Sequence, residues 1–359
     1  MNVKVVTGAN LGDEGKGMVA FSLAKEATSK NEKVLSILYN GGVQRAHTAN
    51  GQVVHCTGTG DLVGGTTYYD EHFVVDPIAL WLTETKVYIH PKCRVVLPCD
   101  VVRNREKEIS RGLLKHGSCG MGIFECVKRN KYNHLKLCAA DLKDNFSLYT
   151  KVEQMKNTLA YGIDDDVYNT DNFMRASDYV VRNCPIVELS QVVSDYDTLI
   201  FEGGQGLLLD QSNMGDFPHL TPSSVGSYNI HNVINNIGAE STDVFYVSRS
   251  YMTRHGAGPM DEECEKKDIN PTIVDTTNIP NDWQGSLRFG YIDTDKLYRR
   301  VKSDFSRYNN AKLNMVFTQL NYTNNGIATG KNKTEEIVVP RFVDGLYLSD
   351  QKDVINKIF

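Results

Sequence analysis

The sequence lacks the features that mark membrane, exported, nucleic-acid-coating and zinc proteins. Its 359 residues contain no apolar run near the roughly 20 that a membrane-spanning helix needs. The start, MNVKVVTGANLGDEGKG, has no secretion signal, so we expect a cytoplasmic protein without a membrane partner. Lys and Arg number 39 against 44 Asp and Glu, which argues against a nucleic-acid partner. The eight cysteines form no CxxC pair, and HxH and HExxH are absent, which argues against a zinc site.

Apolar runs of strand length recur along the chain, and helical patterns lie between several of them. No repeat, low-complexity tract or long linker divides the sequence, so we expect a single domain over 1–359. The alternation predicts an α/β fold with a large central, mostly parallel sheet flanked by helices. The predicted strands are Val3–Thr7, Lys33–Tyr39, Arg94–Leu97, Thr198–Glu202, Asp243–Ser248 and Lys312–Phe317, and two predicted helices are Gly15–Glu26 and Ile78–Thr85.

The first predicted strand runs into a glycine-rich turn, Gly8–Gly17, that opens a helix. Backbone N–H groups at a helix N-terminus bind phosphate, glycines let the backbone approach the anion, and Lys16 can offset its charge. The turn departs from a true P-loop because Gly17 stands where that motif has the Mg²⁺-binding hydroxyl. Asp13 therefore becomes a candidate Mg²⁺ ligand or base. The alternative is a tight turn with a solvated acidic cluster.

Three further glycine-rich turns follow along the chain. Asn40–Thr48 contains His47, a candidate acid at a strand end, although a lone histidine is usually structural. Phe201–Gly206 and Thr253–Pro259 are weak signals by themselves, because such loops are common in α/β proteins. Ligands bind where the strand ends of an open α/β sheet meet such turns, so we expect the binding site there.

In this order, the four turns resemble the adenylosuccinate synthetase family. Gly12–Gly17 reads GDEGKG as in that family, and the second turn is similar to GGxNAGHT, with Gln44, Arg45 and Ala46 substituted. The third turn reads FEGGQGLLLD against FEGAQGxLLD, and the fourth reads TRHGAGP against TRxGxGP. Weaker similarity continues between the turns, so the resemblance spans almost the whole chain.

The resemblance implies a ligase that joins L-aspartate to C6 of a 6-oxopurine nucleotide, using a nucleoside triphosphate and Mg²⁺. The amide-like O6 is a poor leaving group, and phosphorylation converts it into a good one that the aspartate amine displaces. The resemblance gives Asp13 two tasks, removal of the purine N1 proton and Mg²⁺ binding together with the Ala46 carbonyl. It has His47 stabilise the migrating phosphoryl group, as phosphoryl-transfer sites do.

The resemblance also implies which residues bind the substrates. Those for nucleotide and phosphate are Gly12, Glu14, Gly15, Lys16, Gly17, Gln44, Arg45, Ala46, Ser118, Cys119, Arg129, Gln205, Thr221, Gln319 and Asn321. Those for the aspartate carboxylates are Thr276, Thr277 and Arg288. Arg129 would reach the nucleotide phosphate of a neighbouring subunit, which implies a homodimer.

Two acceptor nucleotides are compatible with the sequence. The short chain resembles archaeal members of the family and the phage members that convert dGMP to N6-succino-2-amino-2′-deoxyadenylate for diaminopurine DNA. Three departures favour dGMP and a phage protein in a host cytoplasm: the altered turn 44–46, Cys119 in place of a threonine, and the divergent segment Phe217–Ser224. The alternative is IMP, converted to adenylosuccinate in AMP biosynthesis.

The donor nucleotide and the class of protein also have alternatives. The family reads guanine with TKLD, and this chain has TQLN at Thr318–Asn321. Asn321 offers one acceptor oxygen where an Asp accepts both guanine N–H groups, so GTP is the family default and ATP or dATP the alternative. A non-catalytic GTP-binding protein would need a hydroxyl after Lys16 and an NKxD base reader, and the sequence has neither.

Overall fold

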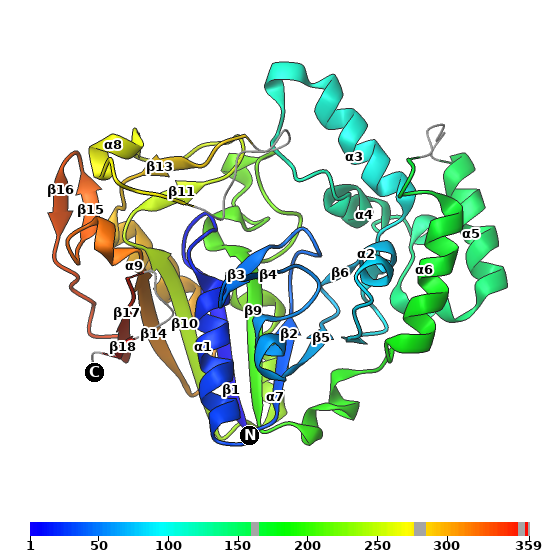
Figure 1. Ribbon diagram of the computed structural model, residues 1–359, viewed down its shortest axis with the longest axis horizontal. Helices are drawn as coiled ribbons and strands as arrows, with labels where there is room; N and C mark the ends of the chain where they lie inside the picture. Colours follow the sequence, from blue (N-terminus) through cyan, green and yellow to red (C-terminus); the bar gives the residue numbers. More distant parts are fainter. Residues whose placement is uncertain (159–164, 276–284, 351–355, 358–359) are drawn as a thin grey trace.

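The structure is a computed structural model that describes residues 1–158, 165–275, 285–350 and 356–357. In these residues nine strands form one central sheet (Figure 1). Every neighbouring pair is parallel except the pair formed by the last two strands along the chain. This confirms the predicted large, mostly parallel sheet. From edge to edge the strands are β18 (Asn356–Lys357), β17 (Gly345–Leu348), β14 (Ala311–Thr318), β10 (Ser241–Arg249), β1 (Asn2–Gly8), β9 (Thr198–Gly206), β2 (Val34–Leu38), β5 (Thr66–Tyr69) and β7 (Tyr88–Ile89).

Five of the six predicted strands occupy the middle of this sheet, as β14, β10, β1, β9 and β2. They read as continuous apolar runs because a parallel sheet is covered on both faces. The sixth, Arg94–Leu97, lies outside the sheet. It is only the two-residue strand β8 (Arg94–Val95), paired with β6 (Val74–Val75). It stops there because Pro98 begins the next helix, and proline fixes the backbone for a first helical turn.

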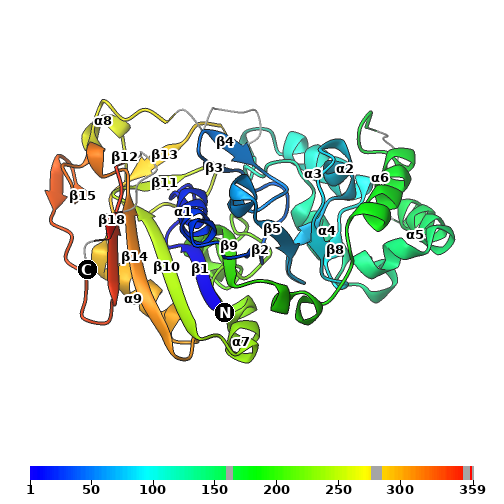
Figure 2. The ribbon, with the colours of Figure 1, turned by 60° about the horizontal axis from the view of Figure 1, so that its bottom comes forward.

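Helices cover both faces of the sheet (Figure 2). On one face lies α1 (Lys16–Ser29), whose Val19 and Ala24 pack against Val6 of β1. On the other face α7 (His231–Ile237) and α9 (Thr294–Phe305) share a hydrophobic cluster with Val5. Val5 and Val6 serve opposite faces because successive strand residues point to opposite sides. The prediction of a helix after the first turn is confirmed.

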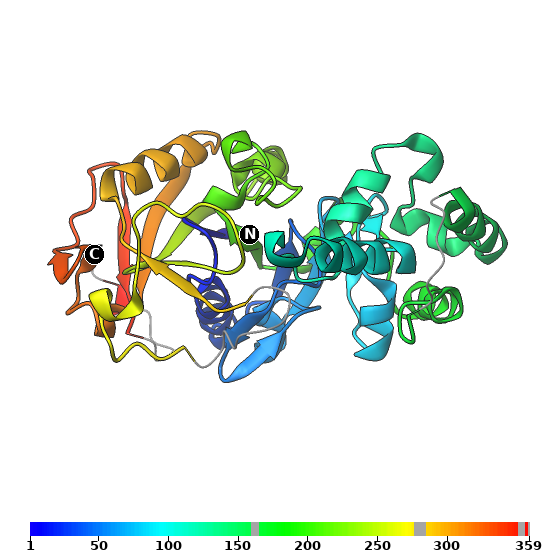
Figure 3. The ribbon, with the colours of Figure 1, turned by 90° about the horizontal axis from the view of Figure 1, so that it is seen from above.

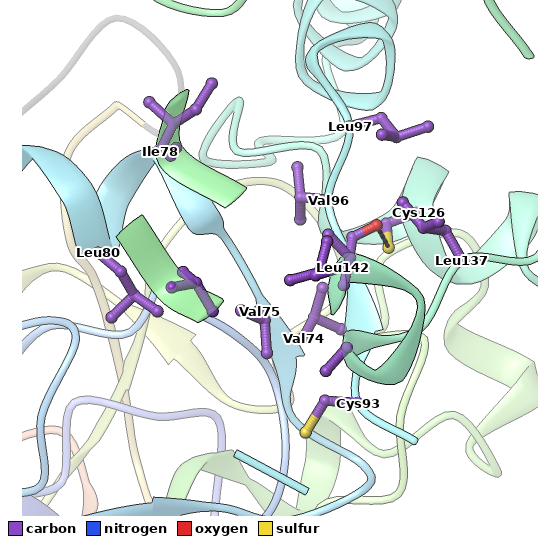
Figure 4. Packing of buried hydrophobic residues seen from close by; sticks show 14 of the residues in the cluster. Val74, Val75, Ile78, Leu80, Cys93, Val96, Leu97, Cys126, Leu137 and Leu142 are labelled. Carbon is purple, nitrogen blue, oxygen red and sulfur yellow. Dashed lines mark hydrogen bonds between the residues drawn. The ribbon is translucent and has the colours of Figure 1, made fainter. Parts of the chain in front are cut away.

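A helical lobe lies beside the sheet edge formed by β5 and β7 (Figure 3). Its helices are α2 (Pro77–Leu82), α3 (Pro98–Ser110), α4 (Ile123–Arg129), α5 (Asn145–Thr158) and α6 (Thr170–Asn183). Figure 4 shows its core, in which Val75, Val96 and Leu142 are fully or almost fully buried. Each such side chain contributes about 1.5–3 kcal/mol of burial free energy. The Asp76 carboxylate caps α2, and the helix ends before the predicted Thr85, where Glu84 has a φ of 50°.

The remaining elements are short. They are β3 (His47–Ala49) paired with β4 (Gln52–Val54), the three-stranded sheet of β11 (Met252–Arg254), β13 (Arg288–Gly290) and β12 (Glu263–Cys264), the hairpin of β15 (Ile327–Gly330) and β16 (Lys333–Glu335), and α8 (Lys266–Ile269). Among the described residues, no helix combines the length and the apolar character needed to cross a membrane.

Candidate active site

The carboxyl ends of the central strands lie at one edge of the sheet, the upper edge in Figure 1, and the turns after them line a single cavity. The cavity measures about 1290 Å³ and is closed on its other side by residues of α3 and α4. Single small-molecule pockets usually measure roughly 300–1,000 Å³, so this one has room for more than one ligand. The predicted residues that line it are Gly12, Asp13, Glu14, Gly15, Lys16, Gly17, Gln44, Arg45, Ala46, His47, Ser118, Cys119, Gln205, Thr221 and Gln319.

The turn between β1 and α1 has the backbone of an anion-binding nest. Gly12, Asp13 and Gly15 have φ values of 104°, 56° and 97°, all in the left-handed region. Successive N–H groups in such a turn converge on one point, and the positive end of α1 lies behind them. Asp13 tolerates this conformation better than most residues. Its backbone carbonyl accepts a hydrogen bond from Arg249, and its carboxylate, 28% exposed, lies on the cavity.

A buried ion pair lies within the same turn. The Lys16 Nζ is 2.8 Å from Glu14 Oε2, and both side chains are at most 3% exposed. The other carboxylate oxygen of Glu14 accepts a hydrogen bond from the Asn10 N–H at 2.7 Å. Buried charges are tolerated when paired and hydrogen-bonded. The pair therefore places a cation whose charge is balanced by Glu14 among the residues that line the cavity.

His47 begins strand β3, and only one of its ring nitrogens has a hydrogen-bond partner among the described residues. Its Nδ1 is 2.5 Å from Oε1 of Glu202, which lies in the middle of β9. Its Nε2 is buried and has no hydrogen-bond partner among the described residues. Burial first, and then the charge of Arg45, lowers the pKa of His47 to about 4 despite the neighbouring carboxylate, so the ring is neutral at pH 7. The bare nitrogen is the group that a ligand in the cavity would meet.

Further polar groups lie on the cavity wall, and two of them lack a hydrogen-bond partner in the described residues. The side-chain oxygens of Gln44 and Gln205 are buried without a hydrogen bond in the described residues, and both residues line the cavity. Burial raises the pKa of the Cys119 thiol to about 11, so it faces the cavity as a neutral, weak donor. Ser118 accepts a hydrogen bond from the Asn104 amide at 2.8 Å, which fixes its hydroxyl on the same wall.

The structure contradicts the predicted role of Arg129. Its side chain is 2% exposed, pairs with Asp100 at 2.8 Å and donates to the Leu135 carbonyl at 2.7 Å. A guanidinium held inside the subunit cannot reach the phosphate of another one. Its neighbours Lys128 and Lys131 line the cavity instead. The homodimer that Arg129 implied stays a prediction.

Arg45 lies on the cavity wall, and its predicted role in nucleotide binding stays a prediction. Its guanidinium lines the cavity but is bound to the Glu202 carboxylate and to the Thr57 carbonyl. Its side chain is 1% exposed. Its NH1 and NH2 groups are therefore occupied by protein groups, whereas its Nε has no hydrogen-bond partner among the described residues.

Two of the residues expected to bind aspartate and the donor base, Arg288 and Asn321, lie away from the cavity wall. Arg288 pairs with Glu263 and donates to the Gly258 carbonyl at 2.8 Å, and it is not part of the cavity wall. Asn321 is exposed on a short 3₁₀ helix, also away from that wall. Thr276 and Thr277 lie outside the described residues.

Comparison with known proteins assigns the chain to a family. The sequence model described as adenylosuccinate synthetase matches residues 5–302. The chain belongs to the adenylosuccinate synthetase family. This is a family of ligases that form carbon–nitrogen bonds.

Its relatives are distant in sequence. Adenylosuccinate synthetase of Clostridium perfringens is 26% identical over 298 residues, 74% of this chain and 67% of the relative. That of Psychrobacter arcticus is 29% identical over 331 residues, 83% of this chain and 73% of the relative. The chain spans about two thirds of the length of the first relatives that it matches.

Two solved structures share the fold. Fully ligated adenylosuccinate synthetase from Plasmodium falciparum aligns with a TM-score of 0.67 at 18% identity, over 89% of this chain and 77% of the other. Cyanophage S-2L succinoaminodeoxyadenylate synthetase, bound to dGMP and to dATP as an energy donor, aligns with a TM-score of 0.57 at 15% identity, over 89% and 85%. Both confirm an adenylosuccinate-synthetase-like fold.

The residues present fit the Mg²⁺ that the family implies. No group of three or more His, Cys, Asp and Glu suited to a metal occurs in the described part of the chain. Mg²⁺ in nucleotide sites is instead held by one or two protein oxygens plus phosphates. Asp13 supplies a partly exposed carboxylate, and Ala46 supplies a carbonyl on the same cavity without the positive φ that its alanine side chain would resist.

Sequence reasoning missed Glu202 as a site residue. Its carboxylate is fully buried and binds His47 and Arg45, and its second oxygen accepts from the Thr59 N–H at 2.9 Å. Burial alone would raise the pKa of the Glu202 carboxyl. The positive charge of Arg45 and the hydrogen bond from His47 outweigh burial and lower this pKa to about 2. A carboxylate at the end of the apolar strand 198–202 was the available signal, since an acid is rarely buried without a partner.

Proposed function

We propose that this chain joins L-aspartate to C6 of a 6-oxopurine nucleotide, driven by a nucleoside triphosphate. The preferred acceptor is dGMP, and the product is N6-succino-2-amino-2′-deoxyadenylate. The proposal is carried by one observation: the glycine-rich turn at 12–17, Asp13 and His47, whose Nε2 has no partner in the described part of the chain, line one large cavity.

The chemistry divides among residues of this cavity. The Asp13 carboxylate removes the N1 proton, so that electrons move to O6 and O6 attacks the γ-phosphorus of the triphosphate. The N–H groups of the 12–15 turn and Lys16 stabilise the charge that develops on the phosphate oxygens. The N1 proton stays on Asp13, and His47 Nε2 stabilises the transferring phosphoryl group by a hydrogen bond to one of its oxygens. Bound Mg²⁺ would be held by Asp13 and the Ala46 carbonyl and would neutralise phosphate charge.

In the second half-reaction the aspartate amine attacks C6. The C6–O bond breaks, inorganic phosphate leaves with the former O6, and the amine proton passes to the departing phosphate. A volume of about 1290 Å³ supports this scheme, because both nucleotides and aspartate must be present together.

Two observations support dGMP, and one favours IMP. The phage neighbour was solved with dGMP and dATP. In this chain the unpartnered oxygens of Gln44 and Gln205 can accept hydrogen bonds from a 2-amino group, which guanine has and hypoxanthine lacks. IMP is the second candidate, since the Plasmodium adenylosuccinate synthetase aligns with the higher TM-score.

An isotope experiment tests the proposed reaction. IMP and dGMP labelled with ¹⁸O at C6 are each incubated with the protein, L-aspartate, Mg²⁺ and GTP or ATP. We expect one ¹⁸O atom in each inorganic phosphate released, because the C6–O bond breaks after phosphorylation. Unlabelled phosphate without a succinylated product would show simple triphosphate hydrolysis and would contradict the proposal.

A further inference from the structure

The buried Arg45 guanidinium lies at the junction of three groups behind the cavity. Its NH2 group binds Glu202 Oε1 and lies 2.6 Å from His47 Nδ1, and its NH1 group donates to the Thr57 carbonyl at 2.9 Å. These contacts connect the 42–47 turn to the middle of β9 and to the chain before Thr59. No ligand is needed to explain any of them.

The contacts of the His47 ring converge on one of its two nitrogens. Nδ1 lies 2.5 Å from Glu202 Oε1 and 2.6 Å from the Arg45 NH2 group, which are themselves hydrogen-bonded to each other. Nε2 is the ring nitrogen left without a partner among the described residues. The charged groups that act on this ring are Arg45, Lys16 and Glu202.

The packing around the ring leaves it little freedom. A Cβ on Gly17 of α1 would lie 2.7 Å from the His47 Cβ, so the backbone of α1 packs closely against the His47 side chain. The Thr59 N–H and hydroxyl hold the second oxygen of Glu202 at 2.9 and 3.2 Å. If Arg45 were absent, Glu202 would be a buried carboxylate with an uncompensated charge beside the ring.

We propose that Arg45 is a positioning residue that holds Glu202 and His47 so that His47 presents its bare Nε2 to the cavity. This inference rests on the proposed function, in which that nitrogen meets the transferring phosphoryl group. The NH1 and NH2 groups of the guanidinium are bound to Thr57, Glu202 and His47, so its proposed action runs through the imidazole. Its position in the motif, where the family pattern has alanine, makes this support particular to chains that carry arginine there.

A double-mutant cycle of Arg45→Ala with His47→Asn tests the inference. We expect Arg45→Ala to lower kcat by at least about 30-fold, while the KM for the acceptor nucleotide changes by less than about 3-fold, since only the ring is displaced. In the His47→Asn background the same change should lower kcat by less than about 2-fold. Equal, multiplicative losses in both backgrounds would overturn the inference and leave Arg45 a structural residue.

Two further variants separate positioning from folding. Arg45→Lys keeps the charge but not the fork, and we expect it to retain the melting temperature while losing most of kcat. In Arg45→Ala with Glu202→Gln the uncompensated charge is gone, so the fold should recover and kcat should stay low. Recovery of kcat in that pair would contradict the positioning role. Added guanidinium chloride at millimolar concentration should partly restore kcat in Arg45→Ala.

A measurement that needs no turnover distinguishes this inference from the proposed function. Long-range ¹H–¹⁵N spectra report which ring nitrogen of His47 is protonated. We expect one well-defined ring state in the natural sequence and a mixture of states in Arg45→Ala, because the ring is no longer held in one place. An unchanged spectrum would refute the inference even in an active enzyme, whereas an inactive protein with the expected change would refute only the proposed reaction.

Discussion

The substitution Gly17→Ala tests the close approach of α1 to His47. A Cβ at Gly17 would lie 2.7 Å from the His47 Cβ, 3.2 Å from its Cγ and 3.3 Å from Thr59 Cγ2. Carbon atoms in ordinary contact are about 3.5–4.0 Å apart, so the imidazole must move by about 1 Å. A displacement of that size at a reacting group costs about 10²-fold in rate. This loss corresponds to about 2.7 kcal/mol of transition-state stabilisation.

Whether Gly17→Ala raises or lowers the free energy of unfolding also tests this contact. In an open helix, alanine would stabilise relative to glycine by about 1 kcal/mol. Overpacking a tight contact destabilises by about 1–3 kcal/mol, so we expect a net loss of about 1 kcal/mol here. Urea denaturation measures the stability, and initial rates with saturating substrates measure kcat. Gly215→Ala is the matched control, because a Cβ there meets no atom within 4 Å.

The outcome that would refute this reasoning is a Gly17→Ala variant that is more stable than the natural sequence and turns over at its rate. It would mean that His47 does not need its observed place. Equal losses of activity in Gly17→Ala and Gly215→Ala would also contradict it, since the control changes no contact of the ring.

Three other predictions concern the acid, the base and a buried carboxyl. Asp13→Ala should abolish product formation with little change in the urea midpoint, and near-normal activity would remove Asp13 from the mechanism. His47→Asn should lower kcat by at least about 10²-fold, and a smaller loss would make the ring structural. Burial raises the pKa of Asp61 from 3.8 to about 7, so the folded state holds an extra proton and the stability due to this group falls as pH rises from 4 to 7. The free energy of unfolding of Asp61→Asn, relative to that of the natural sequence, should therefore rise by about 2 kcal/mol from pH 4 to pH 7.5, a value reduced for partial exposure. Urea denaturation measures this difference, and a difference that does not change with pH would contradict the prediction.

Much of the fold could be predicted because parallel strands carry a strong local signal. Runs such as Val3–Thr7 are apolar at every position, and only a sheet covered on both faces needs that pattern. Arg94–Leu97 has the same composition but pairs outside the sheet. Local sequence does not say which partner a short strand finds, and here Pro98 limits it to two residues.

The place of the site could be predicted from the sequence, but the role of each residue in it could not. The turns at Gly12–Gly17 and around His47 were found because glycine-rich turns after strands have a physical purpose. The role of Arg129 was wrong, because a basic run on a helix does not show which charge faces inward to Asp100. The partnership of Arg45 and Glu202 was missed because 157 residues separate them and only the fold brings them together.

The most direct test of the account is one ultraviolet assay matrix of acceptor and donor. The protein, Mg²⁺ and L-aspartate are mixed with dGMP or IMP, each with GTP, ATP or dATP, and formation of the succinylated nucleotide is followed. The account predicts turnover of dGMP in preference to IMP. Turnover of IMP alone would contradict the dGMP assignment, and turnover of neither by a protein that still binds nucleotide would contradict the ligase itself.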